Sequence, residues 1–281
     1  MTDRRPVLKF IRRHELPAFV FLLLGSVLMV FPFVWMVLSS FKSPADVYKY
    51  PPKWLPSKFG PENFVEVFHK IPFLLFYFNS IITSSVQTLL QIFVSVTGGY
   101  AFAKLDFPGR KKLYSFMQSS MFVPEAVMMI PLFLIVATAQ LVNTYPGLIL
   151  PQIASAFTTI LLFSFFQSIP SDLIDAAKID GCGYYRILSR VVLPNSRTAI
   201  GTAALFAFLT HWRSYLWPLI VTNGVQIRTL PIGLRYLVQE SSSEYQVMMA
   251  AALMAIVPVL VVYMLAEKQF VRSITLTGLK S

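Results

Sequence analysis

The stretch that decides the fold is "IDAAKIDGCGYYRILSRVVLP", from Ile174 to Pro194, a polar, helix-like segment between two very apolar parts of the chain. Aspartates near its start and arginines near its end suit the two ends of a helix. Gly181 favours a bend between two short helices, and Pro194 is expected to end the segment. Apolar residues recur at helical spacing on one face: Ile174, Ala177, Tyr184, Leu188 and Val191. This periodicity favours a small helical hairpin packed on its own bundle over one that docks onto a partner.

The composition places this hairpin in a membrane protein. Of the 281 residues, 56% are hydrophobic and only 13% are charged, about half the charged share of an ordinary soluble domain. The net charge of +11 falls in blocks beside apolar runs. That arrangement indicates membrane topology and argues against a nucleic-acid partner. Cys182 is the only cysteine and the three histidines are scattered, so no metal site is expected.

Six apolar stretches are long enough to cross a bilayer, which takes about 20 residues per helix. They predict an all-α integral membrane protein with six transmembrane helices, and they cover residues 17–40, 74–102, 114–141, 147–166, 198–221 and 247–266.

Six crossings place both termini on one side of the membrane. One set of connecting segments carries 16 lysines and arginines and the other carries 7, and the richer set is expected to be cytoplasmic. Both termini and the Ile174–Pro194 segment are therefore expected inside the cell. The predicted organisation is a cytoplasmic N-terminal segment (1–16), a six-helix membrane domain (17–267) and a cytoplasmic tail (268–281). The membrane domain includes an external loop (41–73) and a cytoplasmic loop (169–196).

The spacing within the segment also resembles a known motif. Asp175-Ala176-Ala177 is followed after three residues by Gly181, and after nine more by the run Val191–Pro194. This resembles the EAA loop of permease subunits of ABC importers, with Asp for Glu at 175 and Val for Ile at 191. Asp180 before Gly181 is similar to the carbohydrate-importer branch. Other segments, such as "GGYAFAKLDFPGRK" (98–111) and "FVPEAVMMIPLF" (122–133), resemble the same family.

The resemblance implies one half of a heterodimeric permease, similar to those of maltose importers, in a bacterial or archaeal cytoplasmic membrane. Such a subunit moves an oligosaccharide or related carbohydrate inward. The implied partners are a second homologous permease, two cytoplasmic ATPases, an extracytoplasmic solute-binding protein and the lipid bilayer. ATP and Mg would be bound by the ATPases, and this chain has no G-x-x-x-x-G-K-[ST] loop. We therefore expect a transport subunit that is not an enzyme and binds no cofactor itself.

The same resemblance assigns coupling residues to the loop between helices four and five. Asp175 would be the charged contact to the ATPase, and Gly181 the position of bend and close approach. The full set that it implies is Asp175, Ala176, Ala177, Asp180, Gly181, Leu193 and Pro194.

Polar and aromatic residues within the spans are candidates for the substrate path. Glu125 lies between Pro124 and Pro131, which predict a broken or kinked helix. Its carboxylate would line a hydrated cavity or, equally, bond a neighbouring helix, for instance at Arg213. Aromatic faces stack on sugars, although Trp217 also suits a membrane-interface belt. The candidates are Asn79, Glu125, Trp212, Arg213, Tyr215 and Trp217.

Three alternatives remain open from the sequence. A glycerol-3-phosphate or polyol-phosphate importer would use a closely similar permease, and Arg213 would suit an anionic substrate. An ion-coupled secondary transporter predicts internal repeats and paired discontinuous helices, which the sequence does not show, and it leaves the spacing within residues 175–194 unexplained. A membrane enzyme predicts clustered acid–base or metal-binding residues at one membrane face, whereas Glu125 and His211 fall on different helices.

Overall fold

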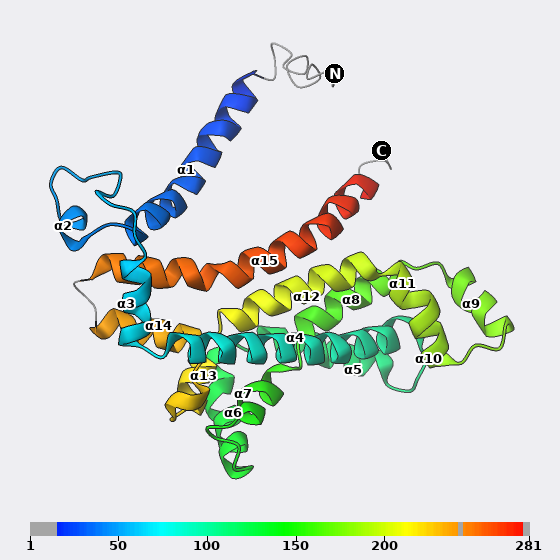
Figure 1. Cartoon of the computed structure of the whole chain (residues 1–281). Coiled ribbons are helices and arrows are strands. Elements are labelled where there is room, and N and C mark those ends of the chain that lie inside the picture. Colours follow the sequence, from blue (N-terminus) through cyan, green and yellow to red (C-terminus); the bar gives the residue numbers. More distant parts are fainter. Residues whose placement is uncertain (1–15, 241–243, 278–281) are drawn as a thin grey trace. The chain divides into compact units, whose positions relative to one another are not determined.

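The computed structural model describes residues 16–240 and 244–277, and every regular element within these ranges is a helix (Figure 1). The chain is all-α, as predicted. The predicted N-terminal segment 1–16 lies outside the described residues except for Leu16, and the tail is described only as far as Thr277. The chain forms two compact units. The first unit comprises the chain up to Ile71 and Leu237–Met254, and the second comprises Pro72–Tyr236 and the chain from Ala255 onward.

The first unit contains the first apolar helix and the loop after it. Its helices are α1 (Leu16–Ser40), α2 (Pro44–Val47) and α3 (Glu62–Lys70), with the start of α15 (Tyr245–Thr277). Almost all side chains of α1 are exposed, as expected for a helix that faces lipid or another membrane subunit. The loop after α1 is ordered by Asp46, whose carboxylate accepts hydrogen bonds from the Ser57 backbone N–H at 2.8 Å and from Lys53 at 3.1 Å.

The second unit is built around α4 (Phe73–Lys104), which packs most extensively against α8 and α12. Gly99 lets α4 approach α8 closely, since a Cβ at this position would lie 3.3 Å from the Thr159 carbonyl oxygen. The remaining α-helices of this unit are α5 (Arg110–Ser119), α6 (Glu125–Thr138), α7 (Tyr145–Ile149), α8 (Ala156–Gln167), α9 (Ser171–Ile179), α10 (Tyr184–Ile187), α11 (Leu193–Asn195), α12 (Arg197–Trp212), α13 (Leu216–Val221), the first part of α14 (Leu230–Glu240) and the part of α15 from Ala255 onward.

Polar residues line the buried side of α4 at intervals of three and four. They are Asn79, Ser80, Thr83, Ser84, Gln87, Thr88, Gln91 and Ser95. In a membrane, this face favours protein over lipid, because helices exchange hydrogen bonds across such contacts. The stripe therefore fixes which side of α4 meets α8 and α12.

The predicted count of six transmembrane helices is not confirmed in the described part of the chain. Three helices there are long and apolar enough to cross a membrane, namely Leu16–Ser40, Phe73–Lys104 and Tyr245–Ala266. Two further pairs qualify only as bent spans, Arg110–Phe122 with Glu125–Thr138 at 107° and Tyr145–Gln152 with Ala156–Gln167 at 46°. The predicted fifth span is instead the 16-residue helix α12 and the short α13, separated by Arg213–Tyr215.

Prolines explain two of these breaks. Val123 takes an extended backbone (ψ 117°) before Pro124, as steric contact with a following proline requires, so the predicted kink in the third span is confirmed as a break. In a continuous fifth helix, the ring of Pro218 would clash with the carbonyl of Ser214, four residues earlier. The break before α13 places Pro218 in the first turn of a new helix instead.

Candidate functional sites

The Ile174–Pro194 segment forms two helices joined by a tight turn, as its sequence predicts. Gly181 has a φ of +76° and ends α9. Its N–H donates to the Lys178 carbonyl at 2.9 Å, and the Cys182 N–H donates to the Ala177 carbonyl at 2.9 Å. This pair of bonds is the Schellman arrangement, which uses a left-handed residue, usually glycine, just after the helix. The bend at Gly181 is thus a backbone requirement.

The apolar face of the hairpin differs from the predicted set at one residue. Ile174, Ala177 and Leu188 are buried, in one cluster with residues of α4, α8 and α12, but Tyr184 is 64% exposed. A single helical periodicity cannot run through the turn at 180–183, and Leu188–Val192 winds as a π-helix with a different repeat. The change of register buries Ile187 and Val192 instead.

The end of the hairpin also differs from the prediction. Helical backbone continues from Tyr184 through Pro194 to Asn195, so the helix ends at Ser196, two residues after the predicted stop. The helical path changes direction at Ser196, before α12 begins at Arg197. Leu193 packs against the buried cluster and Pro194 is exposed.

Two side chains of α4 hold the hairpin. The Tyr100 hydroxyl donates to the Tyr184 carbonyl at 3.3 Å, and the Lys104 ammonium donates to the Ile169 carbonyl at 2.7 Å. Together with the buried cluster, these contacts attach both helices of the hairpin to the body of the second unit.

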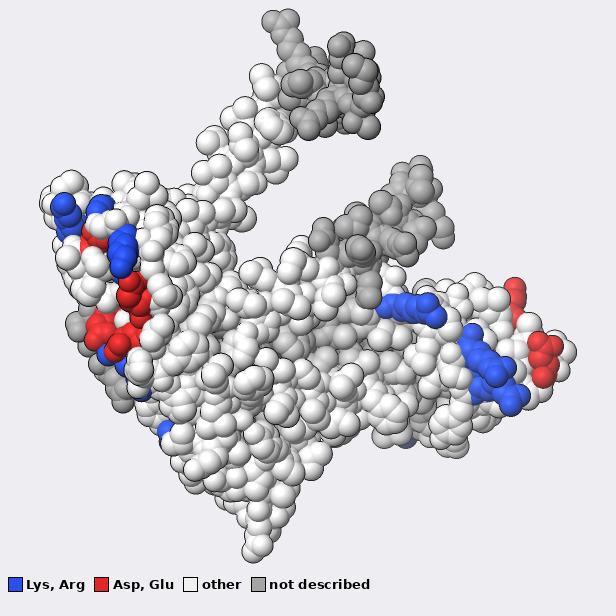
Figure 2. Space-filling model, viewed as in Figure 1, with Lys and Arg blue, Asp and Glu red and all other residues white. Residues whose placement is uncertain are grey.

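The outer surface of the hairpin is charged and exposed. Asp175 pairs with Lys178 at 2.9 Å, with both side chains more than half exposed, and Ala176 and Asp180 are exposed beside them. Figure 2 shows acidic and basic side chains gathered at this end of the second unit, beside a nearly uncharged helical surface. Open space surrounds Gly181, where an added Cβ would meet nothing within 4 Å. The close approach implied by the family resemblance is therefore not made by this chain itself.

A separate cavity of about 380 Å³ lies where the three broken spans meet. Its walls come from the start of α6, the end of the turn after α7, and the α12–α13 break. The lining residues are Glu125, Met129, Gln152, Thr210, His211, Arg213, Ser214, Tyr215, Leu216 and Trp217. Irregular backbone at membrane depth is tolerated where it lines a cavity or is buried in protein.

Three of the six substrate-path candidates offer exposed groups to this cavity. Glu125, Arg213 and Tyr215 all line it and are at least partly exposed. Within the described residues, no hydrogen bond or ion pair joins the Glu125 carboxylate to Arg213, whose Nε donates to the Leu209 carbonyl at 3.2 Å.

The other three candidates have buried structural contacts. The Asn79 amide donates to the Gln226 and Arg228 carbonyls at 2.8 and 2.9 Å and accepts from the Tyr145 hydroxyl at 2.7 Å. Trp212 packs on Phe208 and Tyr77 with ring centroids 5.9 Å apart in both cases.

Trp217 is only 1% exposed, and its indole N–H donates to the Leu148 carbonyl at 3.2 Å. It therefore lies in the core, and its expected place in an exposed aromatic belt is wrong.

A chain of buried hydrogen bonds lies beside the cavity, and the sequence did not predict it. His211 Nε2 lies 2.8 Å from Gln91 Oε1, Gln91 Nε2 donates to Thr158 Oγ1 at 2.7 Å, and the Thr158 hydroxyl donates to Ser155 Oγ at 3.1 Å. Gln91 continues the polar repeat of α4, so this repeat was the signal available in the sequence.

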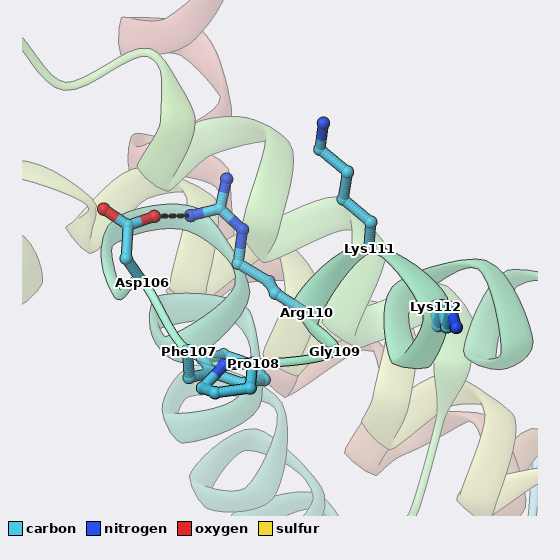
Figure 3. Close-up of a pocket in the computed structure, with 7 residues that line it drawn as sticks. All are labelled: Asp106, Phe107, Pro108, Gly109, Arg110, Lys111 and Lys112. Atoms are coloured by element: carbon cyan, nitrogen blue, oxygen red, sulfur yellow. Dashed lines mark hydrogen bonds and ion pairs between the residues drawn. The ribbon is translucent and has the colours of Figure 1, made fainter.

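The turn between α4 and α5 is also hollowed, but its walls are seven consecutive residues, Asp106–Lys112 (Figure 3). Arg110 pairs with Asp106 at 2.8 Å, while the side chains of Lys111 and Lys112 extend away from that pair. No other element contributes to this hollow, and we assign it no site. Its basic residues belong to the lysine- and arginine-rich set that predicts the cytoplasmic side.

Comparison with protein families gives one match. Residues 95–276 match the family described as "Binding-protein-dependent transport system inner membrane component". The matched range covers more than half of the chain and includes both the hairpin and the cavity.

Individual relatives agree with this match. An arabinooligosaccharides transport system permease from Halalkalibacterium halodurans is 31% identical over 89% of this chain and 91% of that protein. A sulfoquinovosyl glycerol transport system permease from Agrobacterium fabrum is 33% identical, covering 91% and 92%. An sn-glycerol-3-phosphate transport system permease from the same organism is 29% identical, covering 99% of both chains.

A solved structure shares the fold. A chain of a bacterial ABC transporter involved in the import of the acidic polysaccharide alginate superposes with a TM-score of 0.81 at 24% sequence identity. The match covers 92% of this chain and 98% of that chain.

Proposed function

Because the chain belongs to the family of binding-protein-dependent transport system inner membrane components, we propose that it is a permease subunit that imports a carbohydrate across the cytoplasmic membrane. The energy comes from ATP hydrolysed by separate subunits. The cavity at the three helix breaks carries this proposal. Broken helices are tolerated within a membrane where they line a cavity, and this cavity combines Tyr215 with several polar side chains that a ligand can contact.

The chemistry of the cavity suits a polyhydroxylated molecule. Aromatic and apolar walls pack on the C–H surface of a sugar, while a few polar groups orient its hydroxyls. Tyr215 provides an aromatic wall, and Glu125, Gln152 and Arg213 provide hydrogen-bonding groups. Its volume is within the range of about 300–1,000 Å³ that is usual for small-molecule sites.

The hairpin formed by Ser171–Asn195 is the proposed coupling element. Its inner face is fixed to α4, α8 and α12, and its outer face carries Asp175, Ala176 and Asp180 in exposed positions. Because no flexible linker separates the hairpin from these helices in the described part of the chain, a displacement of the hairpin by a bound ATPase would move the membrane helices with it. ATP and Mg are bound by the ATPase that docks there.

The remaining partners follow from the family. They are a second, homologous permease, two ATPase subunits and an extracytoplasmic solute-binding protein. The basic loops, including Asp106–Lys112 and the hairpin, face the cytoplasm together with both termini. The loop after α1 then faces the binding protein.

Arg213 favours a second candidate, an importer of glycerol-3-phosphate or another anionic carbohydrate derivative. Its guanidinium group lines the cavity, and guanidinium groups bind phosphate and sulfonate oxygens well. Two of the three relatives named above are described with substrates that carry phosphate or sulfonate groups. The carboxylate of Glu125 in the same cavity would repel an anionic ligand. Variants of Glu125 and Arg213 should therefore affect the transport of neutral and anionic substrates differently.

Uptake measurements test both candidates. The chain is expressed with its transport-system partners, and uptake of radiolabelled arabinotriose, sulfoquinovosyl glycerol and sn-glycerol-3-phosphate is measured. Uptake of at least one probe that requires ATP and the binding protein is expected. Uptake of none of them, or uptake driven by an ion gradient without ATP, would contradict the proposal.

Variants then test the cavity. E125Q and R213Q should raise the KM for the transported probe, whereas Leu134→Ala, on the exposed side of the same helix as Glu125, should not. For a neutral sugar we expect E125Q to have the larger effect, and for an anionic substrate R213Q. If E125Q removes folded protein from the membrane, the carboxylate is structural and its assignment to the cavity is wrong.

A further inference from the structure

His211 lines the cavity and also belongs to a chain of buried hydrogen bonds. The residue is 8% exposed, lines the cavity, and bonds through Nε2 to Gln91 on α4. Within the described residues, no hydrogen bond involves its second ring nitrogen, Nδ1.

With the Gln91 amide oriented as the structure has it, Nε2 toward Thr158 and Oε1 toward His211, the hydrogen bonds of this chain place the His211 proton on Nε2. The chain ends at Ser155, whose hydroxyl oxygen caps α8 by accepting the Thr158 backbone N–H at 3.2 Å. This oxygen also accepts the Thr158 hydroxyl, so the Thr158 oxygen is left to accept from Gln91 Nε2. Gln91 then presents Oε1 to the imidazole, and an acceptor there requires a proton on Nε2.

A neutral imidazole protonated on Nε2 has an unprotonated Nδ1, which is a hydrogen-bond acceptor. We propose that His211 is a specificity-determining residue of the cavity, accepting a hydrogen bond through Nδ1 from a hydroxyl group of the transported carbohydrate. This inference rests on the proposed function for its ligand, but the arrangement of the histidine itself does not depend on it.

The support behind the ring is what makes this contact selective. Gln91, Thr158 and Ser155 come from α4 and the start of α8, and each has its hydrogen-bonding group engaged. Turning the ring toward another partner would break the bond between Nε2 and Gln91, so a ligand without the hydroxyl leaves Nδ1 unpaired. A site that is built to bond a hydroxyl discriminates strongly against analogues without it, because its own polar atom is left unpaired.

The first experiment measures the tautomer directly. The full chain is labelled with ¹⁵N-histidine and placed in lipid vesicles, and the imidazole nitrogens are observed by solid-state NMR. The chain has three histidines, so the H211Q variant assigns the signals of His211. A neutral ring with its proton on Nε2 is expected. A proton on Nδ1 would overturn the inference, and this result needs no transported substrate.

The second experiment separates the two nitrogens. In H211N the amide oxygen can occupy the place of Nδ1, whereas in H211Q the longer amide reaches the place of Nε2 and keeps the bond to Gln91. We expect H211N to retain the KM for the transported probe within about 3-fold and H211Q to raise it by about 5- to 10-fold, the range of one hydrogen bond. The maximal rate should stay similar in both.

A residue that only holds helices together gives the reverse pattern. H211Q, with the Gln91 contact intact, would then transport normally, and H211N would lose folded transporter; that outcome overturns the inference. If none of the three probes is taken up by the unaltered transporter, the proposed function fails, and the NMR result still decides the arrangement of His211.

Discussion

The Tyr100 hydroxyl on α4 donates a hydrogen bond to the carbonyl oxygen of Tyr184, 3.3 Å away, at the first residue of α10. This bond connects a long membrane helix to the second half of the hairpin. One helical turn further along α4, Lys104 connects the same helix to the segment that enters the hairpin, through Ile169. The two contacts make α4 the mechanical support of the proposed coupling element.

Lys104→Met tests this support. Methionine keeps the length of the side chain but removes the ammonium group, so the Ile169 carbonyl loses its 2.7 Å partner. A hydrogen bond from a charged group contributes about 1.5–3 kcal/mol at most, and we expect the hairpin to loosen without global unfolding. ATP hydrolysis should persist while uptake per ATP falls several-fold. Lys112→Met is the matched control, since Lys112 is exposed in the first turn of α5; equal coupling in both variants would contradict the role of Lys104.

Gly181→Ala tests the turn. Gly181 has a φ of +76°, and there is open space for a Cβ at this position. The added methyl group therefore meets no neighbour, and the cost of the substitution is the backbone strain of a non-glycine residue in the left-handed conformation, about 1–2 kcal/mol. We expect faster hydrogen exchange at the amides of Gly181 and Cys182 and weaker ATPase binding. Gly183→Ala, in the same turn with φ −74°, should change neither. Gly181→Asn should recover part of the loss, because asparagine tolerates this conformation.

The sequence predicted the hairpin, its bend and the all-α fold because these depend on local spacing and on apolar length. It did not predict that Tyr184 is exposed and Ile187 is buried. That outcome depends on the turn at 180–183, which resets the register of the helix that follows it. The π-helical winding of Leu188–Val192 changes the repeat again, but only for residues after Ile187. A periodicity read across a turn cannot carry this information.

The same limit applies to the cavity. Pro124 predicted one of its helix breaks, but hydropathy alone made the fifth span continuous through Arg213–Tyr215. The buried position of Trp217 follows from its bond to Leu148, 69 residues earlier in the chain, and a residue's own sequence neighbourhood does not reveal such a contact. Long-range pairing of α4 with α8 and α12 also decides which polar residues meet, as for Gln91 with His211.

Asp175→Lys tests partner contact on the hairpin. The pair with Lys178 is exposed, and exposed pairs contribute about 0–1 kcal/mol, so the chain should fold and insert normally. We expect loss of ATPase co-purification and of uptake. The exchanged variant D175K/K178D restores the intrachain pair and provides the control. If it also restores the complex, Asp175 acts only through Lys178 and does not contact the ATPase.

Acidification tests the loop after α1. The hydroxyl and backbone N–H of Ser57, and then Lys53, hold the pKa of Asp46 well below its ordinary value. A lowered folded-state pKa means that the charged carboxylate stabilises this loop at any pH above the unfolded value of about 3.9, and that the stabilisation is lost as the pH falls further toward the folded value.

The Ser57 amide, which donates to Asp46 at 2.8 Å, reports this effect. Its hydrogen-exchange protection, corrected for the intrinsic rate, should be constant from about pH 8 to pH 5 and fall only below about pH 4. Asp46→Asn should lower the protection between about pH 5 and pH 8, where the carboxylate is charged, because a neutral amide oxygen is the weaker acceptor. Glu66→Gln removes a carboxylate on α3 that lies beside Lys70, and this variant should leave the Ser57 amide unchanged. Loss of protection with a midpoint between pH 5 and 7 in the unaltered chain would show that a group other than Asp46 controls the loop.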